Sequence, residues 1–304
     1  MRLVDGATLR ATVSVQDAIE AVRDAYIGAA NGEFRTVPRA VLPSHTLFTM
    51  VAERVVDDRN LGQVVKIFSW HENNPSRSLP VLQGTVIWFD GETGVPQVVI
   101  DAAELTALRT GAASGVATDL LARRDAKRLA VIGTGATAPD QIRAVCAVRP
   151  IESVAVAAQD VTKTNVFVRK MQAELNGVDV RAYVRRRDAV HDADVICTAT
   201  NASEPLFRLD DIKPHVHINA IGSFTPQMYE IGPDIVSAAS VCIDDPAAMQ
   251  GSGELAHVHE VPPTLGELLT GRHAFHPGGI TLFKSVGISP QDWAIAALVA
   301  RNQS

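Results

Sequence analysis

The stretch LAVIGTGATA, residues 129–138, decides which fold this chain adopts. Its first four residues are apolar, as in a buried strand, and residues 133–138 then follow the pattern G-x-G-x-x-A. In that pattern the first glycine permits a tight turn, the second lets backbone amides approach a pyrophosphate, and the small alanine lets a helix pack on the strand. Unpaired amides at a helix N-terminus favour an anion. Since a helical pattern follows, the motif predicts a loop that binds a dinucleotide.

The sequence after this loop alternates between helix and strand patterns. Helical patterns lie at 137–149 and 166–175, and apolar strand patterns lie at 153–158, 179–184, 194–200, 215–222 and 240–244. Alternation at this pace indicates a mostly parallel sheet that is covered by helices on both faces. The predicted fold class is therefore α/β with a Rossmann-type dinucleotide-binding domain. The strand at 240–244 is expected to close the series.

The residues up to Arg123 follow a different pattern. A helix capped by Ser14 is predicted at 14–32, and strands rich in β-branched and aromatic residues follow at 64–70, 85–90 and 96–100. A long helix is predicted at 102–124, because apolar residues recur there every three or four positions. This part is expected to be a mixed α+β domain. The helical pattern at 289–302 does not by itself indicate the domain to which it belongs.

The composition is that of a soluble globular protein. Apolar residues make up 46% of the 304 residues and charged residues 20%, so the chain can bury one large core or two smaller ones. The formal net charge of −6 and the lack of a basic tail argue against nucleic acid as the main partner. The cluster Arg185-Arg186-Arg187 is interpreted as a solvated turn. No apolar run approaches the roughly 18 residues that a membrane span needs, and the expected compartment is the cytoplasm.

The residues after the second strand bear on the choice between NAD and NADP. An acid about 20 residues after the glycine motif favours NAD, because it binds the ribose hydroxyls. Here Gln159 and Asp160 follow the strand at 153–158, and Asp160 either reaches the ribose or caps the next helix. No arginine follows immediately to bind a 2′-phosphate. The expected cofactor is NAD(H) or NADP(H), and the lack of that arginine favours NAD(H).

Several segments resemble the ornithine cyclodeaminase/mu-crystallin family, and together they cover nearly the whole chain. They are VPRAVLP (37–43), VVKIFSWHENNPSRSLPVLQG (64–84), ELTALRTGAASGVAT (104–118), VIGTGATA (131–138), DVICTATNASEP (194–205), HINAIGSFTP (217–226) and TLFKSVGIS (281–289). The resemblance implies a homodimer whose subunits bind substrate in a cleft between two domains. The implied bounds are 1–123 plus 288–304 for the substrate and dimerisation domain, and 124–287 for the Rossmann NAD(P)-binding domain.

In this family two arginines and a lysine hold the substrate carboxylate, and the matching motifs place them at Arg39, Lys66 and Arg109. A carboxylate favours a guanidinium fork, and lysine adds a mobile point charge. Lys66 interrupts an apolar strand and Arg109 lies among apolar helix positions, whereas Arg39 also fits a surface position. Lys66 and Arg109 are the predicted catalytic residues. The predicted substrate-binding residues are Arg39, Lys66, Gln83, Arg109 and Phe224.

The predicted cofactor-binding residues come from the glycine loop, from the strand that follows it, and from positions that resemble family contacts. They are Thr110, Gly133, Gly135, Ala136, Thr137, Asp160, Thr200, Asn201 and Ser285. No metal site is predicted, because His257 and His259 lack the acid cluster that a zinc site would need.

Phe224 departs from the family pattern. Cyclodeaminases and alanine dehydrogenases of the family carry an aspartate at this position, where it handles an amine or a water at the reacting carbon. Deamination of a primary amine needs such a base, because water attacks and protons move. Reduction of a preformed, protonated cyclic imine needs hydride, orientation and a carboxylate clamp. The aromatic residue therefore predicts imine reduction.

The resulting hypothesis is an NAD(P)H-dependent oxidoreductase for cyclic imino acids, a ketimine reductase of the Δ1-pyrroline-2-carboxylate to proline type. One alternative is an ornithine cyclodeaminase or alanine dehydrogenase of the same family, with a base from elsewhere. A second alternative is a non-catalytic small-molecule binding protein like mu-crystallin, which the intact set of Lys66, Arg109, Ser285 and the glycine loop disfavours. The expected partners are a small imino or amino acid and a second copy of the chain, without nucleic acid or membrane.

Overall fold

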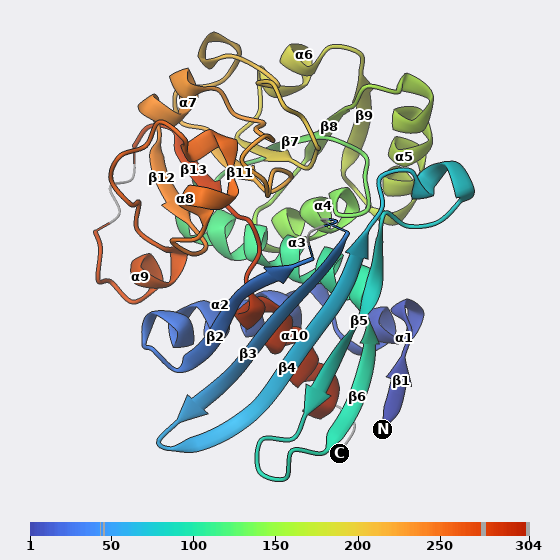
Figure 1. The fold of residues 1–304 in the computed structure, drawn as a ribbon. Helices are drawn as coiled ribbons and strands as arrows, with labels where there is room; N and C mark the ends of the chain where they lie inside the picture. Colours follow the sequence, from blue (N-terminus) through green and yellow to red (C-terminus); the bar gives the residue numbers. More distant parts are fainter. Residues whose placement is uncertain (43, 45, 275–277, 302–304) are drawn as a thin grey trace. The chain divides into compact units, whose positions relative to one another are not determined.

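The computed structural model describes residues 1–42, 44, 46–274 and 278–301, which divide into two compact units (Figure 1). The N-terminal unit is Met1–Ala113 with Ile288–Ser304, of which 302–304 lie outside the described residues, and the Rossmann unit is Ser114–Gly287. The division lies within helix α3 (Ala102–Leu121), whereas the sequence pattern placed it after Arg123. The helix is continuous across the division. Its last turns belong to the Rossmann unit, where Thr118 accepts a hydrogen bond from Asn219 and Asp119 accepts one from Arg149.

One six-stranded sheet forms the centre of the N-terminal unit. Its strand order is β1-β6-β5-β4-β3-β2, with β1 parallel to β6 and the other neighbours antiparallel. The predicted strands and the helix capped by Ser14 are present, and β1, β2 and β3 extend the sheet beyond the prediction. The elements before α3 are β1 (Arg2–Val4), α1 (Gly6–Thr12), α2 (Val15–Ala30), β2 (Phe34–Val41), β3 (Leu47–Val56), β4 (Arg59–Trp70), η1 (Asn74–Arg77), β5 (Leu82–Phe89) and β6 (Pro96–Asp101).

Helix α10 (Ser289–Arg301) belongs to the N-terminal unit, which its sequence pattern did not indicate. It packs against α2 and against strands β3 to β6. The Trp293 indole donates a hydrogen bond from Nε1 to the Gly62 carbonyl over 2.8 Å. Nearly every residue from Ser289 to Val299 is buried. A helix that is buried on almost all sides lacks a polar face, and its periodicity therefore carries little information about its partners.

The Rossmann unit contains a seven-stranded parallel sheet. Its strand order is β12-β13-β11-β10-β7-β8-β9, and all neighbours pair in parallel. The order reverses between β7 and β10, which is the switch point where open α/β sheets bind ligands. The elements are β7 (Arg128–Ile132), α4 (Ala138–Val148), β8 (Ser153–Ala157), α5 (Val161–Glu174), β9 (Asp179–Tyr183), α6 (Arg186–Val190), β10 (Val195–Thr198), η2 (Leu209–Asp211), β11 (His217–Ala220), α7 (Pro233–Ala238), β12 (Ser240–Ile243), α8 (Ala248–Gly251), η3 (Gly253–Leu255), α9 (Leu265–Leu269) and β13 (Thr281–Lys284).

The expectation that the strand at 240–244 closes the series is wrong, because β13 follows it and lies between β12 and β11. The strand TLFK has only four residues and ends in lysine, so its local pattern is weak. Alternate residues of β7 face two apolar clusters: Ala130 and Ile132 face one, and Leu129 and Val131 the other. Both faces of the sheet are therefore covered, as predicted. Within the described residues, no helix has the length and apolar character needed to cross a membrane.

Candidate functional site

Lys66 lies on the buried face of β4. Side chains alternate between the two faces of a strand, so Lys66 shares its face with Val64 and Phe68, which are both buried. Lys66 is 1% exposed, and its ammonium lies 5.0 Å from the centre of the Phe68 ring. Burial lowers the pKa of Lys66 to about 7, and the Asp292 carboxylate opposes this shift. A lysine in this state gains or loses its charge near neutral pH.

A buried carboxylate joins Lys66 to Arg109. Asp292 Oδ1 accepts hydrogen bonds from Lys66 Nζ and from Arg109 Nε, each over 3.2 Å. Arg109 Nη1 also donates to Gln291 Oε1 over 2.7 Å, and Gln291 Nε2 donates to the Tyr26 hydroxyl over 2.5 Å. Arg109 lies on α3, and Gln291 and Asp292 lie in α10. The fold of the N-terminal unit thus brings the two predicted catalytic residues together.

This cluster holds more positive than negative charge. The two cations share one carboxylate, so one positive charge is left over when Lys66, Arg109 and Asp292 are all ionised. The Arg39 guanidinium on β2 is also close enough to help lower the pKa of Lys66. Buried charges are stable only when paired, so a bound carboxylate would complete the cluster.

The other two predicted substrate residues, Gln83 and Phe224, come from different segments of the chain. Gln83 is exposed at the start of β5, where its Nε2 donates to the Pro80 carbonyl over 3.4 Å. Phe224 belongs to the Rossmann unit and is half-buried in the loop after β11. The roles of Gln83 and Phe224 in substrate binding therefore stay predictions.

The glycine loop between β7 and α4 has the backbone that the motif predicts. Gly133 has a φ of +112°, and a Cβ there would lie 2.5 Å from the Ala199 carbonyl oxygen. A side chain at Gly135 would instead begin in open space, because a Cβ there meets nothing within 4 Å. Ala138 is fully buried and packs in the same apolar cluster as Val131. Gly133 is thus required by the turn, whereas Gly135 leaves room beside the loop.

Helix α4 begins without a side-chain cap. Its N-cap residue is Thr137, which makes no side-chain cap hydrogen bond, and a proline occupies the first turn. The first amides of a helix need partners, and a phosphate is a favourable one. The room at Gly135 and the uncapped helix together fit the pyrophosphate of a dinucleotide.

Glu230 fixes the ends of β10 and β11. Its Oε1 accepts from Thr200 N and Oγ1, each over 2.7 Å, and its Oε2 accepts from Thr198 Oγ1 and Gly222 N, each over 2.8 Å. Burial raises the pKa of Glu230. The side chain of Thr200 is therefore held by Glu230. Thr200 is half-buried, and Asn201 beside it is exposed.

Two further buried charges hold the loop that carries Phe224. Glu254 accepts from Ser223 Oγ over 2.6 Å and from Glu230 N over 2.8 Å. Lys284 Nζ donates to the Ser223 carbonyl over 2.7 Å and lies 3.6 Å from Glu254 Oε2. The loop has no acid of its own between Gly222 and Pro226, but it rests on this network.

Three other predicted cofactor residues are placed by the fold. Asp160 caps α5, accepting a hydrogen bond from Lys163 N over 2.9 Å, and its side chain is exposed. Ser285 Oγ donates to Asp244 Oδ2 over 2.8 Å, and burial raises the pKa of Asp244. Thr110 is buried on α3 in the N-terminal unit. Cofactor contacts at these positions stay predictions.

Comparison with known proteins identifies the family. The model of the ornithine cyclodeaminase/mu-crystallin family matches residues 4–304. The chain belongs to this family. A Δ1-pyrroline-2-carboxylate reductase from Bacillus cereus is 34% identical over 244 residues, which are 76% of this chain and 74% of the relative.

Two solved structures of the family share the fold. The Δ1-pyrroline-2-carboxylate reductase of Thermococcus litoralis, in complex with NADH and L-proline, has a TM-score of 0.90 at 29% identity, covering 99% of this chain and 97% of its own. An archaeal alanine dehydrogenase dimer with bound NAD has a TM-score of 0.89 at 28% identity, covering 99% and 95%. The family and the α/β fold class predicted from the sequence are both confirmed.

The structure also reveals several buried polar residues that the sequence analysis did not single out. They are Tyr26, Gln291 and Asp292 around the two cations, and Glu230, Asp244, Glu254 and Lys284 in the Rossmann unit. One signal was available for Asp292 and Lys284, because each is a charge within an apolar segment. The partners of these charges come from distant segments, which local pattern does not reveal.

Proposed function

We propose that this chain is an NAD(P)H-dependent reductase of cyclic 2-imino acids, with Δ1-pyrroline-2-carboxylate as the model substrate and proline as the product. The observation that carries this proposal is the excess positive charge of Lys66 and Arg109 beside one carboxylate. The reductases from B. cereus and T. litoralis, and the proline bound to the latter, support the same substrate class.

The two cations would bind the substrate carboxylate. Arg109 offers a planar fork of donors, and Lys66 adds a point charge whose protonated form is favoured by a second nearby anion. Asp292 holds both cations in place before substrate arrives, so less freedom is lost on binding. A carboxylate fixed in this way orients the adjacent C=N carbon for reaction.

The glycine loop would hold the dinucleotide. Gly135 leaves room for a pyrophosphate, and the uncapped N-terminus of α4 supplies amide donors. When bound, the reduced nicotinamide supplies hydride to the carbon of the protonated imine, whose nitrogen becomes the ring amine. The chain itself then needs to supply orientation and charge rather than a base.

The acids near Phe224 support reduction over deamination. Both oxygens of Glu230 accept hydrogen bonds from the backbone and from threonine side chains. Both oxygens of Glu254 accept from Ser223 Oγ, each over 2.6 Å. Carboxylates occupied in this way support the loop, and we infer that neither acts as the base that the family resemblance implies for deaminating members at the position of Phe224.

The proposed assembly is a homodimer, with the N-terminal unit as its substrate and dimerisation domain. The archaeal alanine dehydrogenase dimer supports this assignment. Light scattering during size-exclusion chromatography would measure the mass directly. The cytoplasm is the proposed compartment, on composition alone.

The test is a substrate panel. Oxidation of NADH and NADPH is followed with Δ1-pyrroline-2-carboxylate, with Δ1-piperideine-2-carboxylate, and with pyruvate plus ammonia, and NAD⁺ reduction is followed with ornithine and alanine. The expected result is turnover of a cyclic imine and little reaction with ornithine or alanine. Efficient deamination of ornithine, with ammonia and proline appearing together, would overturn the proposal.

Variants of the two cations connect this activity to the cluster. Lys66→Met and Arg109→Met should each lower kcat/KM by roughly 30-fold or more, since removing one partner of a buried charge contact costs about 2–5 kcal/mol. Lys127→Met is the matched control, because Lys127 is exposed and pairs only with Glu152 in the described structure. Dinucleotide binding should be unchanged in all three variants.

A further inference from the structure

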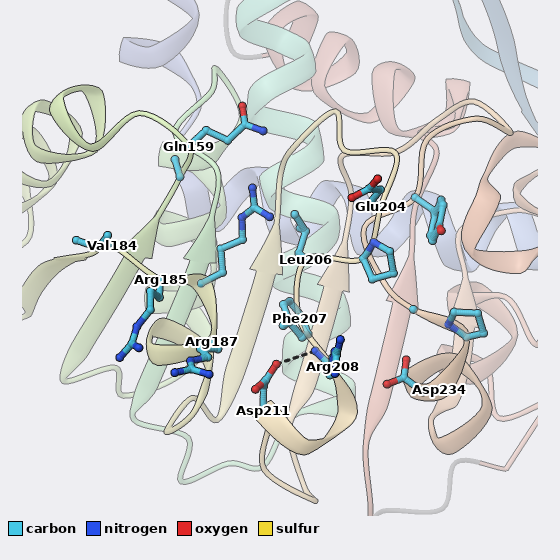
Figure 2. A pocket seen from close by; sticks show the side chains of 16 residues that line it. Gln159, Val184, Arg185, Arg187, Glu204, Leu206, Phe207, Arg208, Asp211 and Asp234 are labelled. Atoms are coloured by element: carbon cyan, nitrogen blue, oxygen red, sulfur yellow. Dashed lines mark hydrogen bonds between the residues drawn. The ribbon is translucent and has the colours of Figure 1, made fainter.

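A large cavity lies within the Rossmann unit at the carboxyl edge of its sheet (Figure 2). Its volume is about 1030 Å³, which is ample for a nucleotide. Its lining residues come from the segments after β8 and β9 and from two loops further along the chain. They are Ala158, Gln159, Val184, Arg185, Arg186, Arg187, Glu204, Pro205, Leu206, Phe207, Arg208, Asp211, Tyr229, Gly232, Pro233 and Asp234.

The charges of the cavity are divided between its sides. Figure 2 shows Gln159, Arg185 and Arg187 on the side of β8 and β9, and Glu204 and Asp234 on the opposite side. Asp211, which Figure 2 shows between these two groups, accepts from Arg208 N, and Asp234 accepts from Leu209 N, each over 2.9 Å. The lining residues that follow β8 and β9 include three arginines and no acid.

Arg186 differs from its two neighbours. Arg185 and Arg187 are exposed, and both pair with Asp188, at 2.6 Å and 3.6 Å. Arg186 is half-buried, lines the cavity, and has no ion-pair partner within the described part of the chain. The cluster was interpreted as a solvated turn; Arg185 and Arg187 are exposed, and the central residue is partly buried. A half-buried guanidinium that lines a cavity is a suitable partner for an anion.

The cavity lies where a Rossmann fold binds the adenosine ribose. Strand β8 is the neighbour of β7, which carries the glycine loop at its carboxyl end. The residue that contacts the ribose 2′ position follows the second strand. Here Ala158 and Gln159 occupy that end and line the cavity. Asp160 is not among the lining residues, and its carboxylate caps α5.

We propose that this cavity binds the adenosine 2′-phosphate of NADP(H) through Arg186, and that the chain therefore binds NADPH more tightly than NADH. A guanidinium pairs with two phosphate oxygens, and the neutral Gln159 amide donates a further hydrogen bond. An acid at the end of β8 would repel the phosphate, and none lines the cavity there. This preference rests on the proposed function. It reverses the expectation of NAD(H) that came from the lack of an arginine directly after the strand at 153–158.

Direct titration of the purified protein with NADPH and NADH, read by fluorescence, tests the preference. Arg186→Ala should weaken NADPH binding roughly 10- to 100-fold, because a hydrogen bond to a charged group contributes about that much. NADH binding should stay nearly unchanged. Gln159→Asp should also weaken NADPH selectively, by repulsion. The control is Arg181→Ala, because Arg181 is exposed on β9, pairs with Asp179, and does not line the cavity.

Competition separates the contribution of the 2′-phosphate from the rest of the cofactor. Adenosine 2′,5′-bisphosphate should displace the bound dinucleotide at lower concentration than 5′-AMP, and Arg186→Ala should remove the difference. Equal affinity of the wild type for NADPH and NADH, or equal losses in Arg186→Ala, would overturn this inference and leave the reductase standing. If the folded wild type binds neither dinucleotide, the proposed function itself is wrong.

Discussion

Lys66 and Arg109 donate hydrogen bonds to the same atom, Asp292 Oδ1, each over 3.2 Å. Lys66 and Asp292 are 226 positions apart in the sequence, and both are almost completely buried. One carboxylate oxygen thus sets the distance between two cations, and it does so without neutralising both. When all three groups are ionised, a bound anion would balance the remaining positive charge. This balance makes the cluster sensitive to pH.

The affinity for a carboxylate ligand should fall as the pH rises above about 7. Burial lowers the pKa of free Lys66 to about 7, so the lysine is charged below that pH and must take up a proton to bind an anion above it. Linkage then predicts that the affinity falls about tenfold per pH unit, until the pH reaches the pKa of Lys66 in the complex. Calorimetry with pyrrole-2-carboxylate and saturating oxidised dinucleotide, from pH 6 to 9, measures this. Lys66→Met should abolish the pH dependence, and a flat wild-type profile would remove Lys66 from the site.

Asp292→Asn should move the same pH profile to lower pH. The Asp292 carboxylate favours the protonated form of Lys66, so its loss lowers the pKa of the lysine further. The amide is nearly isosteric and keeps an acceptor for Arg109. A role confined to packing would reduce the affinity for the carboxylate ligand at every pH without shifting the midpoint. An unchanged midpoint in a folded Asp292→Asn protein would therefore contradict the positioning role of Asp292.

The same substitution at two glycines should separate folding from cofactor binding. Gly133→Val places a β-branched residue at a φ of +112° and against the Ala199 carbonyl, which should cost about 1–3 kcal/mol or more of unfolding free energy. Gly135→Val begins in open space, so its melting temperature should be close to that of the wild type. It should nevertheless lose dinucleotide binding, because the side chain fills the space beside the phosphate loop. Unchanged dinucleotide affinity in Gly135→Val would mean that the loop is only structural.

Phe224→Asp should weaken imine reduction and introduce a base. The aspartate would introduce the residue that the family resemblance implies for deaminating members, in a loop held by Glu230, Glu254 and Lys284. We expect a lower reductive kcat/KM and a trace of amine oxidation, measured as ammonia release from ornithine or alanine. Phe224→Leu is the matched control, since it stays apolar and should not release ammonia. Equal behaviour of the two variants would show that an acid at this position does not decide the reaction.

The local sequence was sufficient to predict the backbone of the glycine loop and the class of fold. The glycine motif requires a positive φ at Gly133 and a small residue at Ala138, and both requirements act within a few residues. The strand and helix periods around the motif are also local. The burial of Lys66 followed from its place in an apolar strand. The family resemblance then assigned α10 to the N-terminal unit, which periodicity alone did not indicate.

Tertiary structure alone decided which charges meet. Asp292 reaches Lys66 only because α10 packs on the sheet, and Arg186 lines a cavity only because β8 and β9 are neighbours. Glu230 ties together the ends of two strands for the same reason. The sequence does not distinguish a solvated charged residue from a buried one. The protonation state of such a residue depends on the distance to its partners and on the exclusion of water. Packing sets those two quantities between segments that lie far apart in the chain.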